Sequence, residues 1–142
     1  DGEKGITLPA DVFASFIELV EETYGVDGKS ALYDAGWDMA LTEQPLNRNK
    51  KSILEHLNQR GLGQFTFTVF DMKKPIFYIK SVNDPIETSF RKIYGLQQFP
   101  MNSFVSGYFA GLFSRLLEME LRCEEKECRV QGKKQCLFKI SI

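Results

Sequence analysis

Residues 102–117 read NSFVSGYFAGLFSRLL, and this stretch decides how the rest of the chain can fold. Its apolar residues recur at the three- and four-residue spacing of a helix and cover a broad face. The pattern therefore predicts a central helix from Asn102 to Leu117 that is packed against other elements. The apolar face consists of Phe104, Val105, Tyr108, Phe109, Leu112, Phe113 and Leu116.

Two glycines, Gly107 and Gly111, lie four residues apart on this helix. They leave a groove on one face, at a helix-propensity cost of about 1 kcal/mol each. The groove can serve close packing of the helix on a sheet. It can also form one wall of an apolar ligand pocket together with Tyr108 and Phe104, closed from the opposite side by Trp37. The residues alone leave both interpretations open.

Three helical segments precede the central helix, over about residues 9–24, 29–42 and 49–60, each followed by glycine or proline. Gly36 in the second segment permits close approach by a neighbour. The period then changes to two over 65–69 and 75–82, which predicts a β-hairpin. A short helix is expected over 86–94, and two or three strands over 121–142. The order of helices, hairpin, helix and terminal strands predicts an α+β fold.

The C-terminal segment contains Glu125, Cys128 and Cys136 around a turn at Gly132. If residues 125–130 and 135–140 are strands folded back at the glycine, both thiols come within reach of one tetrahedral metal ion. A cross-strand disulfide fits the same spacing. Since buried cysteines often act only as small apolar residues, inert core is the third interpretation.

Size and charge limit the classes of protein that the chain can belong to. Its 142 residues support one domain, which we interpret as 1–142. The formal net charge of −1 and the absence of a basic stripe argue against nucleic-acid binding. The apolar stretches are far shorter than the roughly 20 residues that span a bilayer.

Cysteine usage and the first residues suggest the setting of the chain. Three cysteines, an odd number, fit a reducing compartment, so we expect a cytoplasmic protein. The chain begins Asp-Gly-Glu without methionine. We therefore expect a piece of a longer protein, whose output domain lies elsewhere.

Catalytic motifs are absent from the sequence. There is no glycine-rich phosphate loop and no nucleophile elbow, and the single histidine, His56, has no partner by spacing. An enzyme is therefore disfavoured. The many aromatic residues instead favour an internal apolar pocket, and the candidates for its lining are Trp37, Phe67, Phe77, Phe104 and Tyr108.

Three motifs together, Gly107-Tyr-Phe-Ala-Gly-Leu112, Glu125-x-x-Cys128 and Gly132-x-x-x-Cys136-x-Phe138, resemble the 4-vinyl reductase domain family. The resemblance implies an antiparallel sheet of four to five strands flanked by four to five helices, similar in fold to the small subunits of TRAPP vesicle-tethering complexes. It also implies dimerisation, and in aromatic-responsive members a phenol-like effector enclosed beside a structural zinc.

Carried over to this chain, the resemblance implies zinc ligands at Glu125, Cys128 and Cys136. The fourth ligand of the family is a cysteine at the position of Asn102, and a neutral amide is a far weaker donor to zinc. Cys123 is the candidate substitute.

We therefore expect a sensory domain that binds a small apolar or aromatic molecule. A thiol redox sensor using Cys128 and Cys136, or either with Cys123, is one alternative, and an assembly subunit similar to the TRAPP proteins is another. A homodimer is expected through helices of the N-terminal half, where Phe13 and Phe16 form a face larger than one core can cover.

Overall fold

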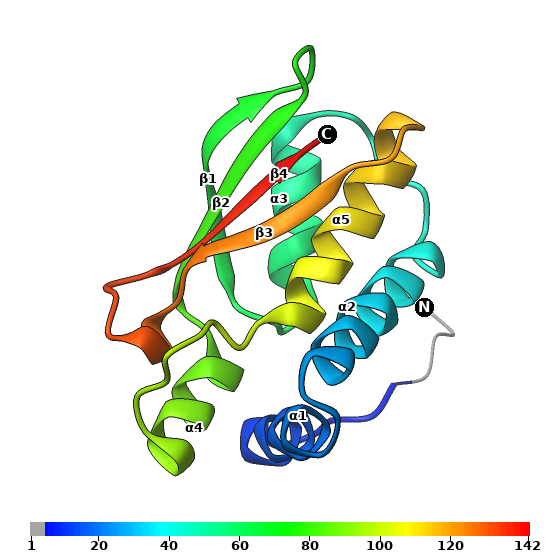
Figure 1. The fold of residues 1–142 in the computed structure, drawn as a ribbon. Helices are drawn as coiled ribbons and strands as arrows, with labels where there is room; N and C mark the ends of the chain where they lie inside the picture. The colour runs from blue at the N-terminus through cyan, green and yellow to red at the C-terminus, as the bar shows by residue number, and fades with distance from the viewer. Residues whose placement is uncertain (1–4) are drawn as a thin grey trace.

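The structure is a computed structural model that describes residues 5–142. These residues form five α-helices, one short 3-10 helix and a four-stranded sheet, which confirms the predicted α+β fold (Figure 1). The elements are α1 (Ala10–Tyr24), α2 (Val26–Leu41), α3 (Lys50–Gln59), β1 (Gln64–Asp71), β2 (Ile76–Asn83), α4 (Pro85–Tyr94), α5 (Ser103–Leu117), β3 (Arg122–Glu127), η1 (Arg129–Gln131) and β4 (Cys136–Ser141).

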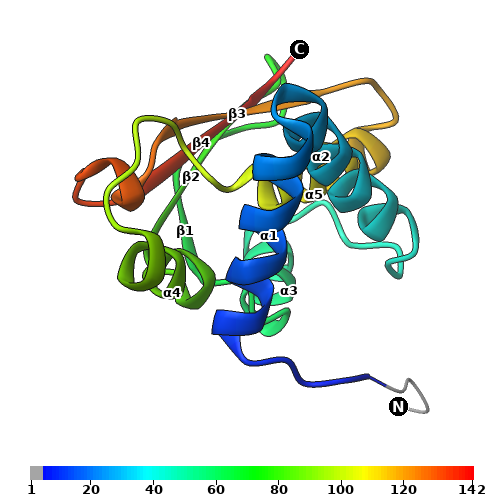
Figure 2. The ribbon, with the colours of Figure 1, turned by 60° about the horizontal axis from the view of Figure 1, so that its bottom comes forward.

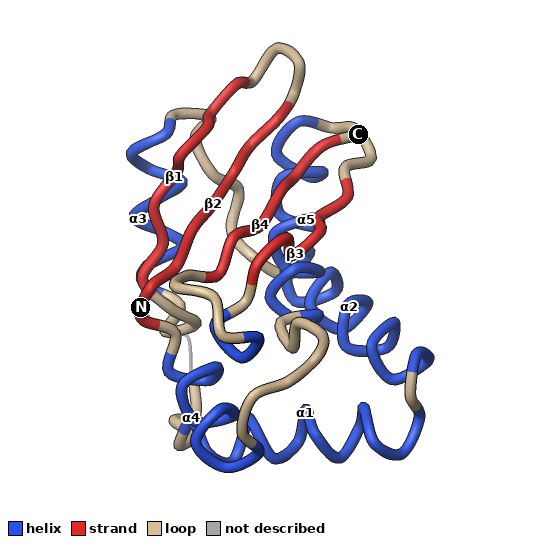
Figure 3. The backbone as a smooth tube through the Cα atoms, turned by 60° about the vertical axis from the view of Figure 1, so that its left-hand side comes forward, coloured by secondary structure: helices blue, strands red, loops and turns tan. Residues whose placement is uncertain are grey.

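The sheet is antiparallel throughout, with strand order β1-β2-β4-β3 (Figure 3). The C-terminal strand β4 is inserted between β2 and β3, so that Cys136 pairs with Ser81 and Phe138 pairs with both Ile79 and Glu125. This order brings the end of β2, the end of β3 and the start of β4 to one end of the sheet.

Helices cover one face and one end of the sheet. In Figures 1 and 3, α3 and α5 lie behind the strands, and α2 packs against α5. Figure 2 shows α1 crossing at the end of the molecule, where it contacts α2 and α4. No helix among residues 5–142 combines the length and the apolar character needed to cross a membrane.

An aromatic core joins the sheet to α5. The rings of Phe77 and Phe113 have centroids 4.7 Å apart, and Phe109 meets Phe138 edge to face at 5.1 Å. Phe67 lies 6.1 Å from Phe113. Such pairs bury large apolar area in a preferred geometry. Phe67 and Phe77 therefore pack in the main core between strands and helix.

The glycines of α2 and α5 face each other, as close approach at Gly36 predicted. A Cβ on Gly36 would lie 2.0 Å from the carbonyl oxygen of Phe104, and one on Gly107 would lie 1.8 Å from that of Tyr33. A Cβ on Gly111 would lie 2.9 Å from the carbonyl oxygen of Trp37. The groove predicted on α5 is therefore filled by the backbone of α2, and the neighbour is a helix where the sequence suggested a sheet or a ligand.

The C-terminal turn differs from its prediction. Strand β3 begins at Arg122 and ends at Glu127, so Cys128 follows the strand and Val130 lies in η1. Gly132 closes this turn with a φ of 87°, a conformation that glycine adopts without strain. The expected strand over 125–130 is therefore wrong by three residues, because the chain tightens into a 3-10 turn before it reaches the glycine.

Candidate metal centre and ligand groove

A buried polar cluster occupies the end of the sheet where α4 and α5 begin. Cys128 follows β3, Cys136 starts β4, and Glu125 belongs to β3. Two residues at helix starts complete the ring, and a third comes from the first turn of α4. We call the whole set the acidic cluster: Asp84, Glu87, Asn102, Glu125, Cys128 and Cys136.

The two thiols and Glu87 form a group that can hold a metal ion. The Sγ atoms of Cys128 and Cys136 are 3.7 Å apart, and both residues are free cysteines. The Glu87 carboxylate contacts the Cys136 thiol. One ligand atom from each of these three buried residues lies within 4.8 Å of the other two.

Asn102 holds Glu125 at the edge of this group. Its backbone N–H donates to Glu125 Oε1 at 3.0 Å, and its side-chain Nδ2 donates to Oε2 at 2.8 Å. The same Nδ2 lies 3.6 Å from Cys136 Sγ and 3.8 Å from Cys128 Sγ. The structure thus brings Glu125, Cys128 and Cys136 together as predicted, with an amide nitrogen among them at the position where the family implies a cysteine.

The acidic cluster has more acceptors than donors. Among the described residues, its one ion pair joins Arg129 Nε to Glu87 Oε1 at 3.5 Å. Asp84 Oδ2, Glu87 Oε1 and Asn102 Oδ1 are buried and make no hydrogen bond. Buried polar atoms usually find a partner, so these oxygens favour a site for a cation.

Burial changes the acidity of these groups because it disfavours their charged forms. It raises the pKa of Asp84 to about 7 and that of Glu125 to about 7. It also raises the pKa of Glu87. The hydrogen bond with Cys128, followed by burial, raises the pKa of Cys136. In the metal-free protein the cluster therefore holds protons that a bound cation would displace.

Cys123 lies apart from the other two thiols. It is buried on β3, where its backbone N–H donates to the Tyr33 hydroxyl at 3.1 Å, and it is outside the group that gathers around Cys128 and Cys136. Burial raises the pKa of its thiol, so the neutral form prevails. The structure does not bring Cys123 into the proposed ligand set.

A groove opens between α2, the start of α5 and β3, next to the acidic cluster. It has a volume of about 450 Å³ and includes Glu125 in its wall. A neighbouring hollow of about 560 Å³ continues along α2 to Trp37 and shares Tyr33 and Cys123 with it. We call the first space the α2–β3 groove; its lining is Val26, Lys29, Tyr33, Phe99, Pro100, Ser103, Ser106, Cys123, Glu124 and Glu125.

The predicted pocket residues are dispersed. Trp37 lines the hollow beside the groove, whereas Phe104 packs on Phe13 with ring centroids 5.4 Å apart. Tyr108 is fully buried and donates its hydroxyl hydrogen to Glu43. With Phe67 and Phe77 in the core and both glycines against α2, only Trp37 of the seven borders one of these two spaces. The groove itself was missed by the sequence analysis.

A second buried polar cluster lies on the other side of α5. Glu43 Oε1 accepts a hydrogen bond from the Tyr108 hydroxyl at 2.9 Å and pairs with Arg60 Nε at 3.1 Å and His56 Nε2 at 3.6 Å. Arg115 donates to the backbone carbonyl of Glu43 and to those of Ala40 and Leu41. These five side chains, Glu43, His56, Arg60, Tyr108 and Arg115, form the Glu43 cluster, which ties α3 and the end of α2 to α5.

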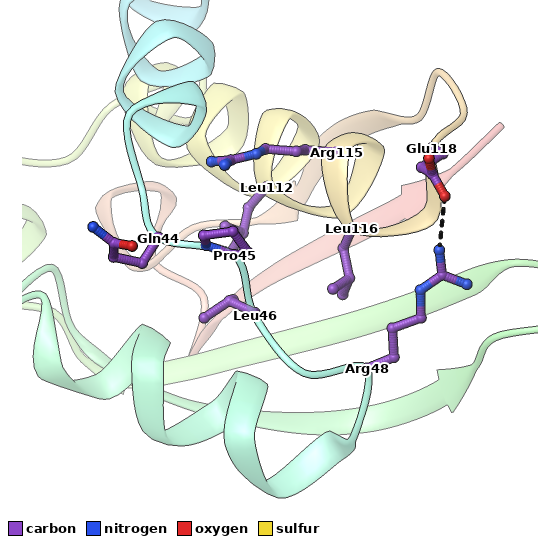
Figure 4. A pocket seen from close by; sticks show the side chains of 8 residues that line it. All are labelled: Gln44, Pro45, Leu46, Arg48, Leu112, Arg115, Leu116 and Glu118. Carbon is purple, nitrogen blue, oxygen red and sulfur yellow. Dashed lines mark hydrogen bonds and ion pairs between the residues drawn. The ribbon is translucent and has the colours of Figure 1, made fainter.

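Figure 4 shows a smaller hollow beside the Glu43 cluster. It has a volume of about 250 Å³, and its rim carries the ion pair between Arg48 and Glu118 at 3.3 Å. Leu112 and Leu116 from α5 form its apolar side. Its charged groups are already engaged with each other or with backbone carbonyls, so it is a weaker candidate than the α2–β3 groove.

Comparisons with known proteins agree on the fold. Residues 91–142 match the family model of the 4-vinyl reductase domain. The phenol-responsive sensory domain of the transcription activator PoxR, solved with phenol, superposes with a TM-score of 0.78 at 16% identity, over 98% of this chain and 77% of that one. No curated protein sequence matches the chain.

Two further solved structures share the fold. A vinyl-4-reductase family protein from Methanocaldococcus jannaschii has a TM-score of 0.66 and 22% identity, covering 99% of this chain and 83% of that one. Subunit 3 of a trafficking protein particle complex from Naegleria fowleri, covalently bound to palmitic acid, has a TM-score of 0.66 and 14% identity, with 93% of both chains covered. The resemblance to the 4-vinyl reductase domain family is therefore confirmed, through the family-model match over residues 91–142 and a fold shared with a solved member of that family.

Proposed function

We propose that this chain is a sensory domain that binds a small aromatic or apolar molecule in the α2–β3 groove, beside a zinc ion held in the acidic cluster. The observation that carries the proposal is that the groove and the cluster share Glu125. The ligand then biases an output domain or a dimer, which requires different affinities for two states of the protein. The proposal is for a binding module and not for an enzyme.

The groove has the chemistry of a small-molecule site. Its volume of about 450 Å³ falls in the usual range of roughly 300–1,000 Å³ for such sites. Val26, Tyr33 and Phe99 supply apolar walls, while Ser106 and Glu125 supply polar groups at the inner end. A ligand with an aromatic ring and one hydroxyl or amine group fits this division. The phenol held by the PoxR sensory domain is such a molecule, and it supports the proposal.

Zinc fits the donor atoms and their spacing. Two sulfurs that each lie about 2.3 Å from zinc in tetrahedral geometry are about 3.8 Å apart. The Sγ atoms of Cys128 and Cys136 are 3.7 Å apart. Thiolate and carboxylate donors together suit this borderline-soft ion, and zinc binding would release the protons that the cluster holds.

A homodimer is part of the proposal. The outer face of α1 exposes Phe16 by 57% and Leu19 by 60%, whereas Phe13 packs inward on Phe104. An exposed apolar face of this kind favours association with a partner. We expect Phe16→Glu to shift a dimer toward monomer in analytical ultracentrifugation; a wild-type protein that is monomeric at tens of micromolar would contradict this.

The groove is tested by thermal shift with phenol as the probe. We compare the wild type with Ser103→Trp, which places a large ring in the groove wall at the start of α5. The control is Ser52→Trp, which puts the same ring at a partly buried serine on α3, outside the groove. Phenol should raise the melting temperature of the wild type and of the control but not of Ser103→Trp. Equal shifts in all three proteins would place the site elsewhere.

A thiol redox sensor is the second candidate, and the 3.7 Å between the Sγ atoms of Cys128 and Cys136 favours it. Both residues are fully buried, so oxidation requires local opening. If metal-free protein loses two thiols under mild peroxide while the zinc-loaded protein keeps them, the redox function and the zinc site use the same sulfurs. If phenol and related probes never shift the melting temperature, an assembly role becomes the better explanation.

A further inference from the structure

We infer that Glu87, on the first turn of α4, is a ligand of the proposed zinc ion and takes the place of the cysteine that the family has at position 102. The inference rests on the zinc site of the proposed function, and it adds a residue from an element that the family motifs do not include. The ligand set becomes Glu87, Glu125, Cys128 and Cys136.

The position of Glu87 carries the inference. Its side chain is fully buried, and its carboxylate contacts Cys136 Sγ. Its ligand atom lies within 4.8 Å of those of both cysteines. Oε1 makes no hydrogen bond although it is buried. A buried carboxylate between two thiols, with an unpartnered oxygen, is well placed to bind a cation.

The backbone of α4 fixes this position. Asp84 caps the helix, and its Oδ1 accepts hydrogen bonds from the N–H groups of Ile86 at 2.9 Å and Glu87 at 3.1 Å. Pro85 occupies the first helical position, where its fixed φ suits a helix. In a capping box the glutamate at this position would reach back to the N–H of the cap residue. Here it reaches the Cys136 thiol instead.

Asn102 has a different task. Its Nδ2 is a donor, and it points at Glu125 Oε2 and toward both sulfurs. A donor group does not ligate a cation, so Asn102 holds Glu125 while the missing ligand comes from α4. The competing explanation is that Glu87 only pairs with Arg129, which lies 3.5 Å from Oε1 with its side chain 28% exposed.

The experiment measures zinc stoichiometry by native mass spectrometry and zinc affinity by competition with a chromophoric chelator. The variants are Glu87→Gln, Asn102→Cys and the double variant with both changes. Glu43→Gln is the matched control, because Glu43 is a buried glutamate in the other cluster. Circular dichroism checks that each variant is folded.

We expect Glu87→Gln to weaken zinc binding at least about 100-fold, since loss of even an outer-shell partner costs about 10–100-fold. The double variant should regain tight binding, because a third thiolate replaces the lost carboxylate. Cobalt(II) substitution should show the absorption of two thiolates in the wild type and of three in the double variant. Glu43→Gln should bind zinc as the wild type does.

Two results would overturn the inference. If the wild type binds one zinc and Glu87→Gln binds it equally well, Glu87 serves Arg129 and not the metal, while the proposed zinc site stands. If the wild type binds no zinc, both the site and the role of Glu87 fail. Should Glu87→Gln fail to fold, Asn102→Cys decides the question alone. A cobalt spectrum of three thiolates with zinc affinity above that of the wild type supports the inference, and an unchanged spectrum contradicts it.

Discussion

The acidic cluster and the Glu43 cluster are both buried polar groups beside α5, but they differ in how their charges are balanced. In the Glu43 cluster one carboxylate meets an arginine, a histidine and a tyrosine hydroxyl. In the acidic cluster three carboxylates and two thiols share one arginine and one asparagine. A complete network holds elements together, whereas an incomplete one needs something from outside.

The difference also separates structure from function. The Glu43 cluster joins α3, the end of α2 and α5, and burial, with Glu43 next in effect, raises the pKa of Tyr108, so that its hydroxyl stays a donor. Nothing in this arrangement calls for a ligand. The acidic cluster has buried oxygens with no donor and borders the α2–β3 groove. The comparison therefore predicts that zinc changes the stability of one cluster and leaves the other unaffected.

The largest expected effect is stabilisation by zinc. Zinc at about 1,000 times its dissociation constant should raise the free energy of unfolding by about 4 kcal/mol, since the ion binds the folded form. Cys128→Ser should remove most of this gain, and Glu43→Gln should keep it. Chemical denaturation with and without zinc measures both. A gain of equal size in Cys128→Ser would show that zinc binds elsewhere.

Removal of the Glu43 carboxylate comes next. Glu43→Ala should lower the free energy of unfolding by about 3 kcal/mol, because breaking a buried ion pair leaves the partner groups unpaired. The loss should be the same with zinc and without it. Urea denaturation under both conditions provides the measurement, and a loss that zinc compensates would mean that the two clusters are coupled through α5.

The pH dependence of the metal-free protein should show a third effect. Asp84 and Glu125 have pKa values raised to about 7 in the folded protein, from model values of 3.8 and 4.5. Between about pH 4 and pH 7 the folded form therefore holds protons that the unfolded chain releases, so stability falls as the pH rises.

One pKa unit corresponds to about 1.4 kcal/mol. Because neighbouring groups share these protons, we expect a total fall of about 2 kcal/mol. Denaturation of chelator-treated protein across this range measures it. Zinc should reverse the trend, since its ligands bind when deprotonated. Metal-free stability that rises over the same range would contradict the assignment.

The smallest effect concerns the Tyr108 hydroxyl. Tyr108→Phe removes one hydrogen bond to Glu43 and keeps the ring, so a loss of about 1 kcal/mol is expected. Combined with Glu43→Ala, the total loss should be less than the sum of the two single losses, because both changes break the same contact. Strict additivity in the double-mutant cycle would show that the hydroxyl contributes independently.

Most of the fold follows from the sequence because its signals are local. Helical period, the Asn49 cap of α3 and the glycine after α4 place those helices within one or two residues of their observed ends. The hairpin of β1 and β2 follows from alternation. The partner of Gly107 and Gly111 does not, because a small-residue face receives a sheet, a helix or a ligand equally well, and only the tertiary arrangement selects α2.

The site was predicted in part for the same reason. Glu125, Cys128 and Cys136 are close in sequence or joined by a turn, and the structure brings them together. Glu87 stands three residues after a helix cap, where glutamate usually serves the helix itself, so its contact with a thiol 49 residues away had no local signal. Glu43 lies in the turn after α2 and meets Tyr108 only through the packing of α5.

The contact of α2 and α5 at Gly36 and Gly107 also has a mechanical consequence. Because backbone meets backbone there, the two helices act as one stiff beam. A molecule that enters beside Tyr33 therefore has no room to wedge α2 from α5. We expect displacement to pass along the beam to Gly25, where α2 joins α1, and to emerge as a tilt of the apolar face that carries Phe16 and Leu19.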